Sequence, residues 1–140
     1  MELLTTNQSL GLEYTVTAAD SARCLQLDSQ DEFPDVLATS RMVGLMEITA
    51  ARLMRCLLQP GQLSVGVSVD MQHLAPTPLA ATIYAKAVYL GLEGRMYRFR
   101  IEVHDAGGCV GSGTHTRAIV CPADLLARAS RRVAGSGEGT

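Results

Sequence analysis

The sequence changes its hydrophobic period once, near Pro60-Gly61, and that change limits the fold more than any other feature. Residues 39–59 place apolar side chains at helical spacing around most of a long helix. From Ser64 onward, apolar and polar residues alternate instead, as in strands with one buried face. Short turns separate these strands, and short turns join antiparallel neighbours. A helix that is apolar on most sides needs a broad cover, so we predict an α+β domain in which an antiparallel sheet wraps the helix.

Local signals place the individual elements. Leu12, Tyr14 and Val16 alternate with polar residues and predict a first strand. Residues 18–36 carry no clean period, and we expect a loop with a turn of helix that could serve as a lid. Thr39 or Ser40 is expected to cap the long helix, which should end at Pro60-Gly61. Later strands are expected at about 64–71, 80–90, 97–104 and 109–121, with turns at 91–94 and 106–108 and a short helix at about 123–131.

Length and charge limit the classes of protein that fit. The 140 residues suffice for one core, so we expect a single domain over 1–140, with a flexible tail from about 132. With a net charge of −2, the sequence gives no reason to expect the basic stripe that binding to nucleic acid would need. No apolar run approaches the roughly 20 residues that a membrane span needs. The first residues lack the features of a secretion signal, so we expect a cytoplasmic protein that binds neither nucleic acid nor membrane.

The four cysteines, at 24, 56, 109 and 121, form no Cys-x-x-Cys pair, and no histidine stands at metal-ligand spacing. Structural zinc is therefore not expected. We interpret the four cysteines as scattered buried thiols in a reducing compartment.

Glu47 is the most unusual residue of the predicted helix. Its same-face neighbours are all apolar or small: Val43, Gly44, Ala50, Ala51 and Met54. An ionised carboxylate on a buried face costs several kcal/mol unless it is paired or its pKa moves. Glu47 is therefore a candidate for chemistry.

His73 is a candidate partner for Glu47. It ends a predicted strand in phase with Val65, Val67, Val69 and Met71, so it should face the helix if no bulge intervenes. The alternative is a histidine at the core edge that bonds a backbone carbonyl. His104 shares a face with charged residues and should meet solvent, while His115 could be structural.

Three glycines and an arginine complete the set of candidate site residues. By alternation Gly66 should lie on the face away from the helix, so it could contribute only its backbone N–H. Gly111 and Gly113 weaken the last strand unless a bulge or a ligand justifies them. Arg117 could bind a carboxylate or phosphate, but an ion pair at the sheet edge is the favoured interpretation.

Several blocks of this sequence resemble the fluoroacetyl-CoA thioesterase group of hot-dog-fold thioesterases over roughly residues 30–120. The blocks are Glu32-Phe-Pro-Asp-Val-Leu-Ala-Thr39, Met42-Val-Gly-Leu-Met-Glu47, His73 with Ala75-Pro-Thr-Pro78, Val103-His-Asp105 and Gly111-Ser-Gly-Thr-His-Thr-Arg-Ala118. The resemblance implies a hot-dog fold, a long helix wrapped by a five-stranded antiparallel sheet.

The resemblance also implies an activity and a set of residues. Enzymes of this group hydrolyse acyl-CoA thioesters as homodimers, with the active site at the subunit interface; assembly into tetramers stays open. The matching catalytic residues here are Thr39, Glu47 and His73. Gly66 falls at the oxyanion contact and Arg117 at an active-site arginine. No metal is expected. No cofactor is expected either, because coenzyme A is part of the substrate.

The acyl group and two other functions stay open. Phe33 matches one aromatic residue of the family's lid, whereas Gln30, Leu37 and Arg41 stand where other aromatic residues are expected. We therefore expect a short-chain or small acyl group, with fluoroacetyl a minor possibility. The alternatives are a dehydratase or hydratase of the same fold, and a non-catalytic protein that binds acyl-CoA or another small ligand.

Overall fold

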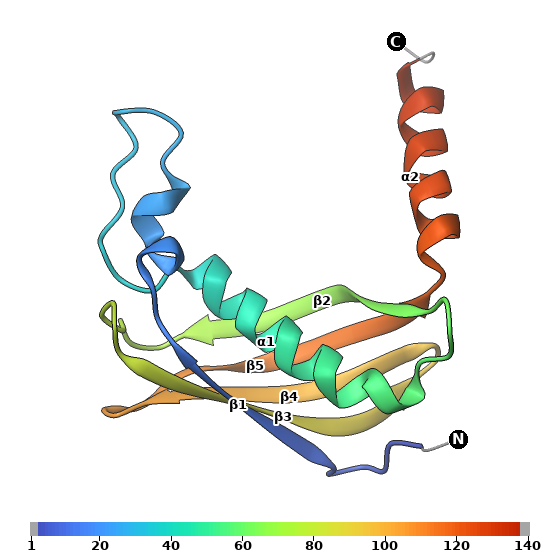
Figure 1. Cartoon of the computed structure of the whole chain (residues 1–140), viewed down its shortest axis with the longest axis horizontal. Coiled ribbons are helices and arrows are strands. Elements are labelled where there is room, and N and C mark those ends of the chain that lie inside the picture. The colour runs from blue at the N-terminus through green and yellow to red at the C-terminus, as the bar shows by residue number, and fades with distance from the viewer. Residues whose placement is uncertain (1–2, 138–140) are drawn as a thin grey trace.

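A computed structural model describes residues 3–137 and confirms the α+β architecture (Figure 1). In chain order the elements are β1 (Ser9–Thr15), the 3-10 turns η1 (Ala18–Asp20) and η2 (Ala22–Leu25), α1 (Thr39–Leu53), the 3-10 turn η3 (Met54–Leu57), β2 (Leu63–His73), β3 (Thr82–Glu93), β4 (Met96–Asp105), β5 (Gly108–Val120) and α2 (Pro122–Gly137). No helix within these residues is long and apolar enough to cross a membrane.

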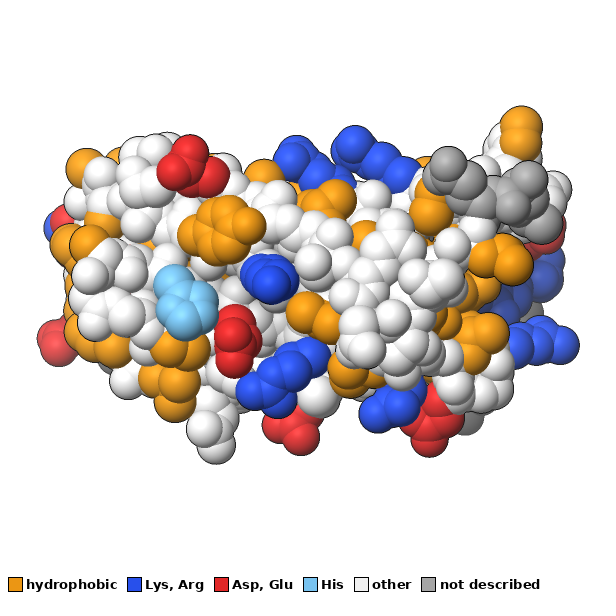
Figure 2. All heavy atoms as spheres, turned by 90° about the horizontal axis from the view of Figure 1, so that it is seen from below, with side chains coloured by type: hydrophobic (Ala, Val, Ile, Leu, Met, Phe, Trp, Pro, Cys, Tyr) orange, Lys and Arg blue, Asp and Glu red, His pale blue; other side chains and the backbone are white. Residues whose placement is uncertain are grey.

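One antiparallel sheet in the order β1-β3-β4-β5-β2 curves around α1, which contacts all five strands. The buried face of α1 carries residues at helical spacing: Met42, Leu45, Met46, Thr49, Ala50 and Leu53. They pack against inward residues of β3 and β4 such as Ala85, Phe99 and Ile101. The outer face of β4 carries Arg100, Glu102 and His104, and Figure 2 shows charged side chains of both signs gathered on that side of the molecule. His104 is about half exposed, as predicted.

The start of α1 differs from the prediction. Ala38 is the N-cap and makes no side-chain hydrogen bond, and Thr39 is the first helical residue. The expectation that Thr39 or Ser40 caps the helix is therefore wrong, and the Thr39 hydroxyl bonds to His73 instead. The helix also ends earlier than expected, because the chain after Leu53 tightens into η3 before it reaches Pro60.

The strand predictions hold, with shorter turns. β3 continues to Glu93, so the turn predicted over 91–94 is only Gly94-Arg95. Gly94 has a φ of +61°, a conformation that glycine adopts without strain. The second turn is Ala106-Gly107, again two residues long. Two-residue loops keep β3, β4 and β5 in register as neighbours.

A β-bulge in β2 overturns the expectation for Gly66. The register between β2 and β5 shifts between Gly66 and Ser68, so Val67 is an extra residue. Because side chains alternate along a strand, an extra residue reverses the phase before the bulge. Gly66 therefore faces the helix and Val65 faces away from it, so the phase predicted for Val65 and Val67 is wrong. His73, beyond the bulge, keeps its predicted direction.

The C-terminal helix and the cysteines also differ from expectation. α2 runs from Pro122 to Gly137, so the predicted flexible tail overlaps its last turns; residues 138–140 lie outside the described residues. α2 projects away from the sheet (Figure 1). Cys24, Cys109 and Cys121 are exposed and Cys56 is half-buried, so the expectation of buried thiols is wrong. The exposed three lie in a surface turn and at the two ends of β5.

The predicted loop at residues 18–36 is anchored by a buried carboxylate, that of Asp20. Asp20 Oδ2 accepts hydrogen bonds from Tyr14 Oη at 2.6 Å and from the Thr17 backbone N at 2.7 Å. Its Oδ1 accepts from Arg41 Nε at 2.9 Å. Burial raises the pKa of Asp20, but these hydrogen bonds outweigh burial and lower the pKa below 3.8. Asp20 thus joins β1, the loop and the first turn of α1.

We predict that Asp20→Asn lowers the free energy of unfolding by about 1.5–3 kcal/mol, because an amide removes the charge from these bonds and turns a donor toward other donors. The contribution of Asp20 should be complete above pH 3.8 and should fade as pH falls through its lower folded pKa. Urea titration at several pH values measures the loss of stability and its dependence on pH. Glu13→Gln, an exposed carboxylate on β1, is the control and should change stability by less than about 0.5 kcal/mol. An unchanged stability in Asp20→Asn would contradict the anchoring role.

Candidate active site

Thr39 and His73 form the first polar pair of the site. Thr39 Oγ1 lies 2.8 Å from His73 Nδ1. The first residue of α1 and the last residue of β2 therefore meet at one end of the helix. The other ring nitrogen, Nε2 of His73, is covered from solvent and has no hydrogen-bond partner within residues 3–137. Buried polar atoms are usually hydrogen-bonded, so this unpaired nitrogen makes His73 a candidate for a functional role.

Glu47 and Arg117 form the second pair. Arg117 Nη1 donates to Glu47 Oε1 at 3.1 Å. The Glu47 side chain is 42% exposed and that of Arg117 7% exposed, so the carboxylate lies at an opening and the guanidinium lies beneath it. Burial lowers the pKa of Arg117, and the bond and charge of Glu47 oppose that shift. The predicted burial of Glu47 is thus only partial, and its charge is paired.

Two other residues hold Arg117 in place. Ser64 accepts from Arg117 twice, at Oγ from Nε (3.0 Å) and at its carbonyl from Nη2 (2.9 Å). His115, 1% exposed, lies with Nε2 3.1 Å from Arg117 Nη1. The other ring nitrogen of His115, Nδ1, lies 2.8 Å from the Ser68 carbonyl. The guanidinium is therefore fixed from β2 and β5 while it bonds to α1.

Gly66 lies directly beneath the Glu47 carboxylate. A Cβ atom at this position would overlap Glu47 Oε1 and would approach His115 Cε1 to 3.3 Å. Only a residue without a side chain lets the carboxylate lie against the β2 backbone here. The bulge and the glycine together make room for the ion pair.

An open pocket of about 570 Å³ adjoins the first polar pair. Its polar side chains are those of Thr39 and His73, and its other lining residues are apolar: Ala22, Leu25, Phe33, Pro34, Val36, Leu37, Leu74, Ala75 and Pro76. Phe33 is 40% exposed and comes from the loop before α1. Such a pocket suits a small apolar group whose polar end meets Thr39 and His73.

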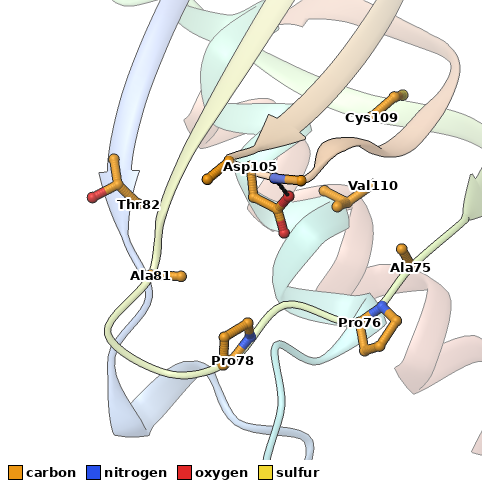
Figure 3. Close-up of a pocket in the computed structure, with 10 residues that line it drawn as sticks. Ala75, Pro76, Pro78, Ala81, Thr82, Asp105, Cys109 and Val110 are labelled. Carbon is orange, nitrogen blue, oxygen red and sulfur yellow. Dashed lines mark hydrogen bonds between the residues drawn. The ribbon is translucent and has the colours of Figure 1, made fainter.

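A neighbouring pocket of about 610 Å³ shares Ala75 and Pro76 with it (Figure 3). Asp105 is the charged side chain of this second pocket, and its two oxygens are occupied. Oδ1 accepts from Gly107 N at 2.8 Å, and Oδ2 accepts from Thr77 Oγ1 at 2.9 Å. Asp105 thus fixes the loop that follows His73, which is a structural role.

The structure changes the pairing that the sequence suggested. Glu47 pairs with Arg117 and His73 pairs with Thr39; within residues 3–137 no hydrogen bond links the two pairs. Arg117 is a buried partner of the carboxylate rather than an ion pair at the edge. His115 also belongs to the site, and its position two residues before Arg117 on one strand face could have shown this. No group of three or more His, Cys, Asp or Glu side chains in the described part of the chain could hold a metal ion.

Fold and site geometry together place the protein in the hot-dog class. A hot-dog-like protein from Thermanaerovibrio acidaminovorans has the same fold, with a TM-score of 0.76 at 20% identity over 91% of each chain.

More specific likenesses define the family. The family described as fluoroacetyl-CoA-specific thioesterase matches residues 16–123. The fluoroacetyl-CoA thioesterase of Streptantibioticus cattleyicolor is 38% identical over 110 residues, which cover 77% of this chain and 79% of that protein. A solved structure of the fluoroacetyl-CoA thioesterase FlK aligns with a TM-score of 0.87 at 32% identity, over 93% of this chain and 98% of that one. The chain therefore belongs to the fluoroacetyl-CoA-specific thioesterase family.

We predict that Gly66→Ala reduces thioesterase activity by about tenfold or more, because the added methyl group displaces the Glu47 carboxylate. Initial rates of thiol release measure this effect. Gly44→Ala is the matched control: it lies three residues before Glu47 on α1, and a methyl group there meets nothing within 4 Å. That variant should keep its activity and gain up to about 1 kcal/mol of stability. Equal activity in both variants would show that the carboxylate does not need its present position.

Proposed function

We propose that this chain hydrolyses a short-chain acyl-CoA thioester to the free acid and coenzyme A through Thr39, Glu47 and His73. Hydrolysis of acyl-CoA thioesters follows from membership of the family, and the chain is an acyl-CoA thioesterase. The residues that carry out the reaction, the acyl group and the assembly of subunits are the proposed part.

The observation that carries the proposal is the partly exposed carboxylate of Glu47, which is held by a buried arginine and lies on the same helix whose first residue lines an apolar pocket. Arg117 occupies Glu47 Oε1, which leaves Oε2 as the oxygen for chemistry. Thr39 and His73 supply a hydroxyl and an imidazole where the pocket meets the start of α1. A carboxylate, an imidazole and a hydroxyl are the groups that activate a nucleophile at a thioester carbonyl.

In the proposed reaction one water is consumed and the carbon–sulfur bond breaks. Glu47 either takes a proton from the water that attacks the thioester carbonyl, or attacks that carbonyl itself. In the second case the thiolate leaves as an acyl–Glu47 anhydride forms, and water then hydrolyses the anhydride to the free acid and the Glu47 carboxylate. His73 and Thr39 orient the carbonyl, and the leaving thiolate takes up the proton that the water loses. No side chain caps α1, so the positive end of the helix adjoins the pocket at Thr39 and favours the developing oxyanion. The reaction needs no cofactor.

The pocket supports an apolar acyl group. Of the residues where the family's lid is aromatic, Phe33 is aromatic and lines the pocket, and Leu37 lines it as an aliphatic side chain. Arg41 bonds to Asp20, and Gln30 is exposed in the loop. A lid with one aromatic ring encloses less of a two-carbon group, so we propose unfluorinated short-chain acyl groups as the preferred substrates.

We further propose a homodimer whose subunits meet along β2. β2 is an edge of the sheet, and its exposed apolar side chains include Val67 at 51% and Val69 at 37%. A long edge strand with apolar residues is a template for pairing with a second copy. Gly66 and His73 lie on this strand, so a partner would cover the site.

The four free cysteines support a reducing, cytoplasmic location.

We predict that the purified protein releases thiol from acetyl-, butyryl- and hexanoyl-CoA. Glu47→Gln should lower kcat by about two orders of magnitude or more, because an amide can act neither as base nor as nucleophile. Glu102→Gln, an exposed carboxylate on the outer face of β4, is the control and should keep the wild-type rate. Tight binding of acyl-CoA without thiol release would instead support a binding protein, and no release from any thioester would refute the proposal.

We predict that sedimentation equilibrium gives a mass of two chains or a multiple of two. Val67→Lys should shift the protein toward single chains and reduce activity, because it places a charge on the proposed interface. Leu92→Lys is the control, since Leu92 is 58% exposed at the far end of β3. A fully active single chain at all concentrations would contradict the dimer.

A further inference from the structure

We propose that His115 is a positioning residue for thioester hydrolysis: it holds Arg117 so that Glu47 keeps one oxygen bonded and the other free. This inference rests on the proposed function of Glu47. His115 itself is 1% exposed and lies beneath the ion pair, so it acts through Arg117 and does not meet substrate.

The hydrogen bonds of His115 fix its protonation. Nδ1 lies 2.8 Å from the Ser68 carbonyl, which can only accept, so Nδ1 carries the hydrogen. Nε2 lies 3.1 Å from Arg117 Nη1, which can only donate, so Nε2 is the acceptor. Only the neutral ring with its hydrogen on Nδ1 satisfies both bonds.

His115 thereby sets the direction of the bond to Glu47. Arg117 Nη1 carries two hydrogens in the rigid plane of the guanidinium. One points to His115 Nε2 and the other to Glu47 Oε1, each at 3.1 Å. Without the acceptor on His115, the first hydrogen would be buried and unpaired. The guanidinium, then held only by Ser64 and Glu47, could shift so that this hydrogen bonds to Oε2, and Oε2 would no longer be free.

The charge around the ring is consistent with this role. Burial lowers the pKa of His115 and the charge of Arg117 adds to that shift, while the Ser68 bond and the charge of Glu47 oppose it. The ring therefore stays neutral to a pH below its ordinary value of 6.5. Protonation at Nε2 would set one N–H against another and release Arg117.

Two conservative variants distinguish the hydrogen bond of His115 to Ser68 from its hydrogen bond to Arg117. In His115→Gln the side-chain oxygen can reach the place of Nε2 and accept from Arg117. In His115→Asn the amide can replace Nδ1 toward Ser68 but falls short of Arg117. We expect His115→Gln to keep kcat within about threefold of wild type. His115→Asn should lower kcat by about tenfold to a hundredfold, with KM within about twofold, because misplacing a catalytic group by about 1 Å costs that much.

A stability measurement checks the neutral ring independently of activity. In wild type, the unfolded chain binds a proton at His115 at higher pH than the folded chain does. The free energy of unfolding should therefore fall as pH drops below 6.5 toward the folded pKa. Both variants should lack this part of the pH dependence, as measured by urea titration.

The outcomes are distinct. If His115→Asn keeps the wild-type kcat, or if both variants lose activity equally, the positioning role is refuted while the proposed function of Glu47 stands. If wild-type protein releases no thiol from any acyl-CoA, the proposed function fails, and the inference fails with it.

Discussion

The ion pair between Arg117 and Glu47 is the contact on which the site depends. It joins the central helix to the two strands β5 and β2, and it gives a carboxylate a partner on a helix face that is otherwise apolar or small. The neighbouring residues either hold the two partners of this ion pair or make room for them. Ser64 and His115 hold the guanidinium, Gly66 leaves room for the carboxylate, and the bulge at Val67 turns that glycine inward.

Each polar pair joins α1 to the side of the sheet formed by β2 and β5. Thr39 and Glu47 are eight residues apart on the helix, about 12 Å along its axis. Because helical side chains lean toward the N-terminus, Glu47 reaches back toward Thr39. His73 lies at the Thr39 end of β2 and Gly66 beside Glu47, so the proposed substrate would have to extend along β2 to meet both pairs. The apolar pocket lies at the Thr39 end, which suits the acyl group.

Much of the fold could be predicted from the sequence, because one period change separates the helix from the strands. The direction of His73 was also predicted correctly, since the bulge precedes it. Gly66 was placed on the wrong face because a bulge leaves no mark in an alternating pattern. Hydroxyl residues usually cap helices, which favours Thr39 as a cap, but here the distant His73 bonds to its hydroxyl. The partner of Glu47 was missed because a contact across 70 positions depends on register.

The central claim, that Arg117 serves the reaction by holding Glu47, is tested most directly by a double-mutant cycle. The cycle compares kcat/KM for wild type, Glu47→Gln, Arg117→Gln and the double variant with one short acyl-CoA. If Arg117 acts only through Glu47, the double variant should be no slower than Glu47→Gln, within about threefold. If the two losses multiply in the double variant, Arg117 and Glu47 act independently and the account is contradicted.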